Sequence, residues 1–280
     1  MAIIALASGP ASAWARKVEK YLGEKYAAVF CLQVAPGGVL TDAIKDARKH
    51  GAHRILAVGD DSFVRWAAHA MVGSLMPLAP ALVPGSRPIF GHRPLSSGRW
   101  QAQVEQLLFG RFVKVDMAMG GRQPFVHQLL AGLPAGRPGN WPPLLAAFDQ
   151  KTVNVQIEVD RAQLEGEFWC VVVANADFPG EEARWAPGSN WTDQSLDVLA
   201  VKPRSLLQRM KFLKAARKGL HAGLPGVIRF RGQRITIRAA QPWSYSADGD
   251  RLEEAAKVLV LEAKPERLRL VAPANGAERK

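Results

Sequence analysis

Apolar runs and helical patterns alternate along the first 119 residues of the chain. Short apolar stretches, read as strands, are separated by segments whose apolar positions recur with helical spacing. The predicted strands are Ile3–Ala7, Ala27–Leu32, Ile55–Val58, Pro80–Val83 and Phe112–Val115, and the predicted helices are Ala11–Leu22, Leu40–His50, Val64–Leu75 and Trp100–Leu108. Strands that alternate with helices of this length indicate βαβ units and a mostly parallel sheet, which binds ligands at the carboxyl ends of its strands.

The pattern changes near Gly120, where short strands separated by turn residues begin. One helix, Arg204–Lys218, interrupts them. The predicted strands are Val153–Val159, Glu167–Val173, Leu196–Val201, Val227–Phe230, Arg234–Ala239, Lys257–Leu261 and Arg267–Val271. This pattern is typical of an antiparallel β-sandwich. The expected fold is a Rossmann-like α/β domain over residues 1–119, an all-β sandwich domain over 120–272 and a disordered tail over 273–280.

Composition narrows the class of protein. The chain has 280 residues, of which 48% are hydrophobic, so it can bury a sizeable core. Its longest apolar runs, such as Phe168–Ala174, are too short to cross a bilayer. The first residues lack a basic region and read as a buried strand instead of a signal peptide. With two cysteines and no disulfide framework, a cytoplasmic location is expected.

The net charge of +12 is concentrated in one segment, Lys202 to Arg238, within a stretch from Val198 to Ala247 that contains no Asp or Glu. Such a segment favours an anionic partner or forms a solvated basic face. The helix Arg204–Lys218 therefore has two interpretations: peripheral contact with an anionic membrane, or a core-facing helix with a solvated basic side. Its apolar residues at helical spacing are Leu206, Leu207, Met210 and Leu213.

Nucleic acid is a weaker interpretation of the same charge. The alternation in Arg229–Arg231 and Arg234–Arg238 predicts a sheet with one basic face. Phe230 would then point away from that face, whereas a single-strand binder stacks bases on aromatic side chains. We therefore expect no nucleic-acid partner.

The segment Ile55–Phe63 is the main candidate for chemistry. Four apolar residues lead into Gly59-Asp60-Asp61-Ser62, and a helical pattern follows. A strand that ends in a small polar turn and opens a helix is a natural phosphate site. Two adjacent carboxylates would repel phosphate unless a metal ion lies between them.

This loop resembles the Gly-Gly-Asp-Gly-Thr loop of the diacylglycerol kinase and sphingosine kinase catalytic family, which is related to the NAD kinases. Further landmarks follow in the family's order, and together they cover nearly the whole chain. They are Val115-Asp116, Phe125, Gly132, Ala174-Asn175, Ala186–Ser189, Asp193–Val198, His221, Pro225 and Asp248–Asp250.

The resemblance implies an enzyme that uses ATP and Mg²⁺ in the cleft between its domains to phosphorylate a lipid hydroxyl, of diacylglycerol or another lipid alcohol. By that resemblance Asp250 is the catalytic base, and Asp61 organises Mg-ATP. The implied nucleotide-binding residues are Gly59, Asp60, Asp61, Ser62, Phe63, Ser86 and Arg87, and the implied magnesium residues are Asn190, Asp193 and Ser195. The sequence also leaves a homodimer open.

The nucleotide loops depart from the family pattern. The second and third glycines are Asp60 and Ser62, and the threonine is Phe63. The second loop, Pro84–Ile89, keeps only its proline in place, and Arg87 could pair with phosphate or with Asp60 or Asp61. Two alternatives to an ordinary kinase therefore stay open: a degenerate, non-catalytic member that binds a lipid or a protein partner through the same cleft, and a phosphotransferase with another donor.

Overall fold

The structure is a computed structural model that describes residues 2–7, 12–26, 29–34, 40–120, 123–132, 152–177, 184–202, 205–248, 250–251 and 256–272. The tail at 273–280 and the side chain of Asp250 lie outside the described residues. The chain divides into two compact units. Unit 1 is Met1–Val115 together with Glu266–Lys280, and unit 2 is Asp116–Pro265.

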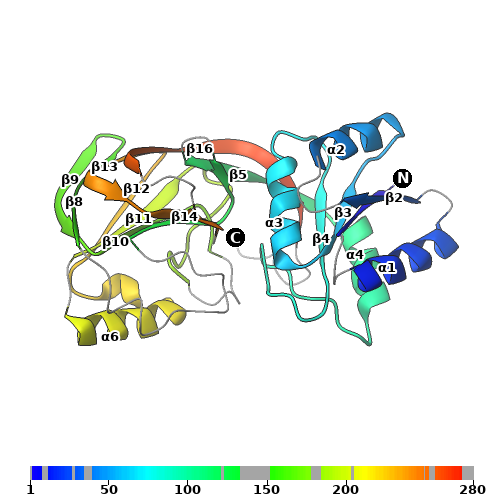
Figure 1. The fold of residues 1–280 in the computed structure, drawn as a ribbon, viewed down its shortest axis with the longest axis horizontal. Helices are drawn as coiled ribbons and strands as arrows, with labels where there is room; N and C mark the ends of the chain where they lie inside the picture. Colours follow the sequence, from blue (N-terminus) through cyan, green and yellow to red (C-terminus); the bar gives the residue numbers. More distant parts are fainter. Residues whose placement is uncertain are drawn as a thin grey trace. The chain divides into compact units, whose positions relative to one another are not determined.

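Unit 1 contains a parallel sheet with the strand order β2-β1-β3-β4-β16, which confirms the predicted α/β class (Figure 1). Its elements are β1 (Ala2–Ala7), α1 (Ser12–Lys25), β2 (Val29–Val34), α2 (Leu40–Lys49), β3 (Ile55–Gly59), α3 (Asp61–Ala70), β4 (Leu78–Leu82), α4 (Trp100–Phe109) and the start of β5 (Phe112–Gly120).

Helices cover both faces of this sheet, with α1 and α4 on one side and α2 and α3 on the other (Figure 1). Every residue of β3 and β4 is buried, which explains why both strands read as continuous apolar runs. Leu56 and Val58 of β3 pack with Val18 of α1 and Val104 of α4. This packing fixes the carboxyl end of β3, where the candidate loop begins.

The last strand, β16 (Ala256–Val271), differs from the prediction of two separate strands. The polar residues between the predicted strands do not interrupt it, and some of their side chains form ion pairs. Glu266 pairs with Lys114 of β5 at 2.7 Å, and Lys264 pairs with Glu262. Near its end, Leu270 pairs in parallel with Leu78 of β4, so this part of β16 belongs to unit 1.

Unit 2 contains two antiparallel sheets, as the sequence predicts, with the strand orders β16-β13-β8-β9 and β12-β11-β10-β7-β14-β15. They enclose a common core that includes Val155 and Ile237 from the first sheet and Val173 and Val198 from the second. The elements are β6 (Gln123–Phe125), β7 (Gln128–Ala131), β8 (Val153–Val159), β9 (Ala162–Phe168), β10 (Cys170–Ala174), β11 (Leu196–Val201), α6 (Leu206–Arg217), the short 3-10 helix η1 (His221–Gly223), β12 (Val227–Gly232), β13 (Arg234–Trp243), β14 (Tyr245–Ala247) and β15 (Asp250–Arg251).

Single residues connect strands that lie in opposite sheets. Trp169 joins β9 to β10, Gln233 joins β12 to β13, and Ser244 joins β13 to β14. The prediction of one strand over Glu167–Val173 is therefore wrong, because the chain changes sheet at Trp169. The corner at Gln233 is fixed by Asp160, whose carboxylate accepts hydrogen bonds from the Gln233 and Arg234 N–H groups.

The corner also corrects the expected basic sheet face. β12 carries Arg229 and Arg231 in the second sheet, whereas β13 carries Arg234 and Arg238 in the first. The four arginines are close in sequence, but the one-residue corner at Gln233 assigns them to different sheets.

Helix α6 covers the outer face of the second sheet, with Phe212, Leu213 and Ala216 buried against it. The predicted helix is thus confirmed, and its four apolar residues differ in environment: Leu213 is buried and Leu206 packs against the core, whereas the other two are exposed. Leu207 is 71% exposed and Met210 is 37% exposed. None of the helices in the described residues is both long enough and apolar enough to cross a bilayer.

A tight hairpin in unit 1 buries a histidine. The Ile89 and His92 backbones exchange hydrogen bonds of 3.1 and 2.9 Å around Phe90 and Gly91, both of which have positive φ. The His92 ring donates a hydrogen bond of 2.8 Å to the Val271 carbonyl at the end of β16. Burial lowers the pKa of His92 to about 4.

We expect His92 to make folding sensitive to acid. Because its folded pKa lies below the ordinary value of 6.5, the unfolded chain binds the extra proton between those values. The contribution of His92 to the free energy of unfolding is complete above pH 6.5 and is lost as pH falls toward 4, by roughly 3 kcal/mol.

In urea unfolding at several pH values, His92→Gln should reduce this loss, and the exposed-site control His53→Gln should not. Burial also lowers the pKa of His221, so part of the slope should persist. An unchanged slope in His92→Gln would contradict the assignment.

Candidate functional site

The turn between β3 and α3 holds five of the predicted nucleotide residues. Asp60 is the N-cap of α3, with φ −76° and ψ 176°, and its Oδ1 accepts a hydrogen bond of 2.8 Å from the Phe63 N–H. Aspartate is among the best N-cap residues because its carboxylate satisfies an unpaired N–H of the first turn. Helix α3 therefore begins at Asp61, one turn earlier than the sequence pattern predicts.

Phe63 lies close against Gly59. A Cβ atom placed on Gly59 would come within 2.5 Å of Phe63 Cδ1, so any larger residue would require Phe63 to move. Gly59 itself is buried. The phenyl ring of Phe63 therefore explains why glycine is needed at this position, without any ligand.

These two contacts decide whether the turn fits a phosphate group. A phosphate at a helix N-terminus is held by free backbone N–H groups and the helix dipole. Here the Asp60 carboxylate binds the Phe63 N–H and brings a negative charge to the same place. In the described arrangement, the turn does not fit the phosphates of ATP.

Asp61 faces the second predicted loop. Its Oδ1 accepts a hydrogen bond of 3.4 Å from the Arg87 N–H, and its Oδ2 lies 3.9 Å from Arg65 Nη2. The structure thus brings Asp61 and Arg87 together, through the Arg87 backbone. Arg65 is buried in α3 and partly compensates the Asp61 charge.

The second loop keeps the turn chemistry of its Pro-Gly pair. Ser86 N–H donates to the Val83 carbonyl at 3.1 Å, and Gly85 has φ +88° between them, as a type II turn requires. The buried Ser86 hydroxyl has no hydrogen-bond partner within the described part of the chain.

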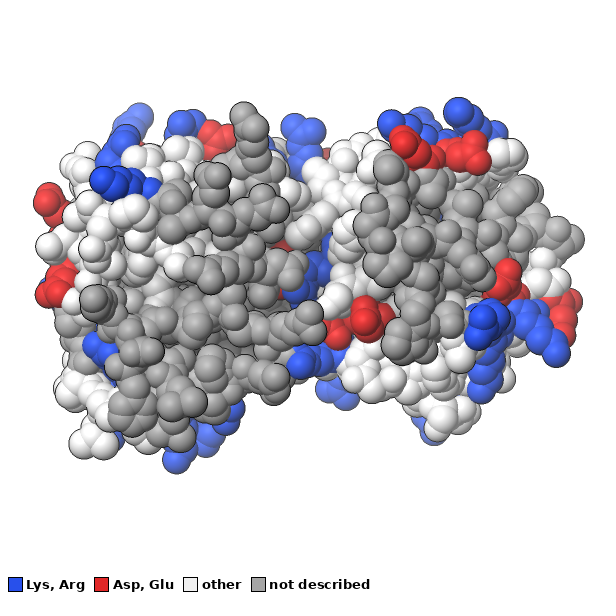
Figure 2. Space-filling model, viewed as in Figure 1, with Lys and Arg blue, Asp and Glu red and all other residues white. Residues whose placement is uncertain are grey.

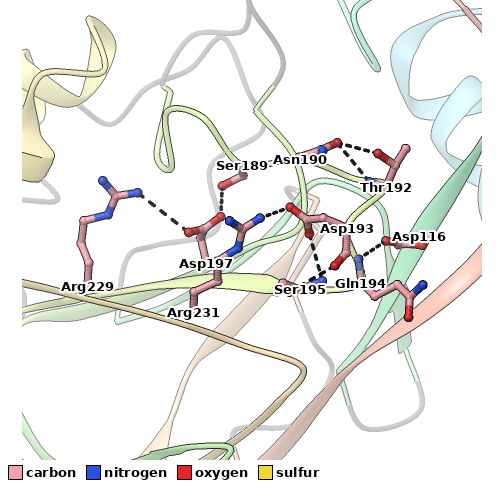
Figure 3. A network of polar contacts seen from close by, with 10 residues as sticks. All are labelled: Asp116, Ser189, Asn190, Thr192, Asp193, Gln194, Ser195, Asp197, Arg229 and Arg231. Carbon is pink, nitrogen blue, oxygen red and sulfur yellow. Dashed lines mark hydrogen bonds and ion pairs between the residues drawn. The ribbon is translucent and has the colours of Figure 1, made fainter. Parts of the chain in front are cut away.

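The three predicted magnesium residues lie in one loop of unit 2, directly before β11 (Figure 3). Asp193 Oδ1 accepts a hydrogen bond of 3.0 Å from the Ser195 N–H, and Ser195 Oγ donates to the Asp193 carbonyl at 3.3 Å. Asn190 instead accepts from the Thr192 backbone and hydroxyl. The loop thus brings Asp193 and Ser195 together, while the Asn190 side chain is bound to Thr192.

Two arginines of β12 compensate an acid of this loop and an acid of β11 (Figure 3). Arg231 pairs with Asp193 Oδ2, and Arg229 Nη2 lies 3.8 Å from Asp197 Oδ1. Asp197 also accepts a hydrogen bond of 2.7 Å from the Ser189 hydroxyl. Arg229 and Arg231 alternate along the strand, so their side chains leave it on the same face.

This pairing bears on the magnesium ion that the resemblance implies. Magnesium takes oxygen ligands in near-octahedral geometry, and a guanidinium beside the carboxylate opposes a second cation. In the described residues, no group of three His, Cys, Asp or Glu side chains could hold a metal ion. With Arg231 against Asp193, the donor set does not fit magnesium.

Asp116 fixes the loop to β5. It is 2% exposed, and its Oδ2 accepts a hydrogen bond of 2.6 Å from the Gln194 N–H (Figure 3). Its own N–H donates to the Trp191 carbonyl at 2.6 Å. Gln194 has φ 59°, a conformation that side chains other than glycine rarely adopt. Asn175, which follows β10, donates to the Asp116 carbonyl at 2.9 Å.

Asp248 has a comparable role beside the predicted catalytic position. Its carboxylate accepts hydrogen bonds of 2.8 to 2.9 Å from three consecutive N–H groups, those of Val126, His127 and Gln128. Asp250 pairs with Ala247 in the backbone of β15 and β14, and its side chain is outside the described residues. Its predicted role as base stays a prediction.

Asp177 and His221 position the Ala186–Ser189 segment. Burial raises the pKa of Asp177, but hydrogen bonds from Arg184 and the Gly188 N–H outweigh it and hold the pKa below its usual range. The buried His221 ring donates to the Trp185 carbonyl at 2.7 Å. Both residues therefore hold the Ala186–Ser189 segment in its conformation.

The sequence pattern missed these structural carboxylates as site residues. Asp116, Asp177 and Asp248 each lie within or just beyond an apolar strand. A lone aspartate in such a position must be paired when it is buried, and this signal could have identified all three.

Comparison with known protein families identifies the sandwich of unit 2. Residues 143–272 match the family described as "YegS C-terminal NAD kinase beta sandwich-like domain". No curated protein matches the sequence.

Solved structures share the fold at low identity. A diacylglycerol kinase from Bacillus anthracis str. Sterne is 14% identical, with a TM-score of 0.71 over 99% of this chain and 98% of that one. A candidate diacylglycerol kinase from the same strain is 16% identical, with a TM-score of 0.77 over 99% and 97% of the two chains. An NAD kinase from Archaeoglobus fulgidus, solved with ATP, is 10% identical, with a TM-score of 0.57 over 97% and 94%. The chain therefore has the fold of the diacylglycerol kinases and NAD kinases, and its residues 143–272 match the C-terminal sandwich domain of the YegS family.

Proposed function

We propose that this chain is a non-catalytic family member that binds lipid and does not bind ATP at the N-terminus of α3. The observation that carries the proposal is the contact between the Asp60 carboxylate and the Phe63 N–H. The chain itself occupies the place where a phosphate would be held.

Two energetic costs oppose phosphate binding at this turn. Releasing the Asp60 cap costs about 1 kcal/mol. A phosphate charge about 4 Å from the Asp60 carboxylate adds repulsion of about 4 kcal/mol at an effective dielectric constant of 20. A metal ion could offset this repulsion, but the acid assigned to magnesium in unit 2 is already paired with Arg231.

A second candidate is the lipid kinase, with ATP- and Mg²⁺-dependent transfer to a lipid hydroxyl. It is favoured by Asp61, which keeps the family's acidic position at the start of α3. In this candidate Asp61 would orient the donor phosphates and Asp250 would accept the hydroxyl proton, while magnesium would neutralise the charge that develops on the phosphoryl group.

We expect no thermal stabilisation of the wild-type protein by Mg-ATP. A ligand at about 100 times its dissociation constant would add about 2.7 kcal/mol, which calorimetry or dye-based melting detects readily. A clear upward shift at millimolar Mg-ATP would refute the proposal. The kinase candidate would then predict that Asp250→Asn abolishes lipid phosphorylation but keeps the shift.

Substitution of Asp60 tests the reason for the lost binding. Asp60→Gly removes both the cap and the charge, so it should allow Mg-ATP to raise the melting temperature, most clearly together with Phe63→Thr. Asp60→Asn is the matched control, because asparagine caps as well as aspartate without its charge. Gain in both variants assigns the block to charge, and gain in glycine alone assigns it to the cap. If neither variant binds, Asp60 is not the obstacle.

Arg231 should make the sandwich loop independent of magnesium. Neither EDTA nor millimolar Mg²⁺ should change the wild-type melting temperature. Arg231→Gln should lose up to about 1 kcal/mol, since the pair is partly exposed, and should then be stabilised by Mg²⁺ at the freed Asp193 carboxylate. Arg234→Gln, which removes the pair with Glu262, is the control and should not respond to Mg²⁺. Stabilisation of the wild type by Mg²⁺ would contradict this account.

A further inference from the structure

Helix α6 is held to unit 2 in one fixed orientation. Phe212, Leu213 and Ala216 are buried, and the Arg209 guanidinium lies 5.3 Å from the centre of the Trp169 ring. A capping box formed by Ser205 and Gln208 closes its first turn. The opposite side of the helix therefore faces away from the sheet that α6 covers (Figure 1).

That opposite side combines apolar and basic residues. Positions separated by three or four residues share a helix face, and here they are Leu207, Met210, Lys211, Lys214 and Lys218, all exposed. Leu207 is 71% exposed, and Leu220 just beyond the helix is 67% exposed. We call these six residues the α6 surface.

The charge of the α6 surface is not compensated as that of the neighbouring strands is. Arg229, Arg231 and Arg234 pair with acids from outside the basic segment. By contrast, no acid in the described part of the chain forms an ion pair with Lys211, Lys214 or Lys218, and α6 contains no Asp or Glu. Figure 2 shows Lys and Arg side chains, without red ones among them, at the lower edge where Figure 1 has α6.

We propose that the α6 surface docks on an anionic lipid bilayer. Lysines attract anionic headgroups, and exposed leucine and methionine side chains enter the boundary between headgroups and acyl chains. A single-stranded nucleic acid would instead need aromatic side chains for stacking, and the aromatic residue of α6, Phe212, is buried. An anionic bilayer is thus the partner that we assign to the proposed lipid-binding function. The inference rests on that proposed function only for its choice of lipid over other anionic partners.

Vesicle co-sedimentation without nucleotide tests the docking. The full chain should bind phosphatidylglycerol/phosphatidylcholine vesicles at low salt and bind pure phosphatidylcholine vesicles much more weakly. The triple variant Lys211→Gln, Lys214→Gln, Lys218→Gln should bind roughly 100-fold more weakly, at about fivefold for each lysine. Leu207→Gln should weaken binding at both low and high salt, because it removes an apolar contact that salt does not screen.

The matched control changes the same net charge elsewhere. Lys20→Gln, Lys45→Gln, Lys49→Gln alters three lysines of unit 1 and should weaken binding far less. Equal loss in both triple variants, no binding of the wild type to anionic vesicles, or binding confined to single-stranded RNA would each overturn the proposal. The vesicle experiment contains no nucleotide, so it is independent of the melting experiment with Mg-ATP. Stabilisation by Mg-ATP would refute the loss of nucleotide binding without refuting the docking, and absence of vesicle binding would refute the docking without changing the result with Mg-ATP.

Discussion

The hydrogen bond between the buried Asp116 carboxylate and the Gln194 N–H controls the arrangement of unit 2 around its polar loop. A carboxylate that is 2% exposed must keep its donors, and leaving such a charge unpaired costs about 3 to 5 kcal/mol. The loop is therefore held against β5 even though Gln194 adopts a strained backbone conformation. Its position in turn presents Asp193 and Asp197 to the arginines of β12.

The regular elements were readable because burial leaves a periodic trace. β3 and β10 are buried on both faces and appear as unbroken apolar runs, and β8 alternates because one face is partly exposed. The start of α3 was missed because its first turn, Asp61-Ser62-Phe63, is mostly polar and resembles a loop. The two interpretations of α6 could not be separated from the sequence because Leu207 and Met210 follow the spacing of core residues without being buried.

The polar site was less predictable for a different reason. The N-cap joins Asp60 to Phe63, only three positions further along the chain, so the local sequence carries that information. The pair of Asp193 with Arg231 joins residues 38 positions apart, and it exists only because β11 and β12 are neighbours. The motif order indicated the fold, whereas the partners of each acid required the strand register. Net charge was misleading in the same way, since three of the four arginines of β12 and β13 pair with acids that lie outside the basic segment.

The one-residue corners at Trp169, Gln233 and Ser244 limit what the sandwich can contain. A single residue spans at most about 3.6 Å, so the chain offers no slack at these three places. Buried side chains fill the space between the sheets, and these corners oppose the separation that an acyl chain would need in order to enter. A hydrophobic ligand would then bind at the outer surface of the sandwich. The two sheets should also unfold together, in one cooperative transition.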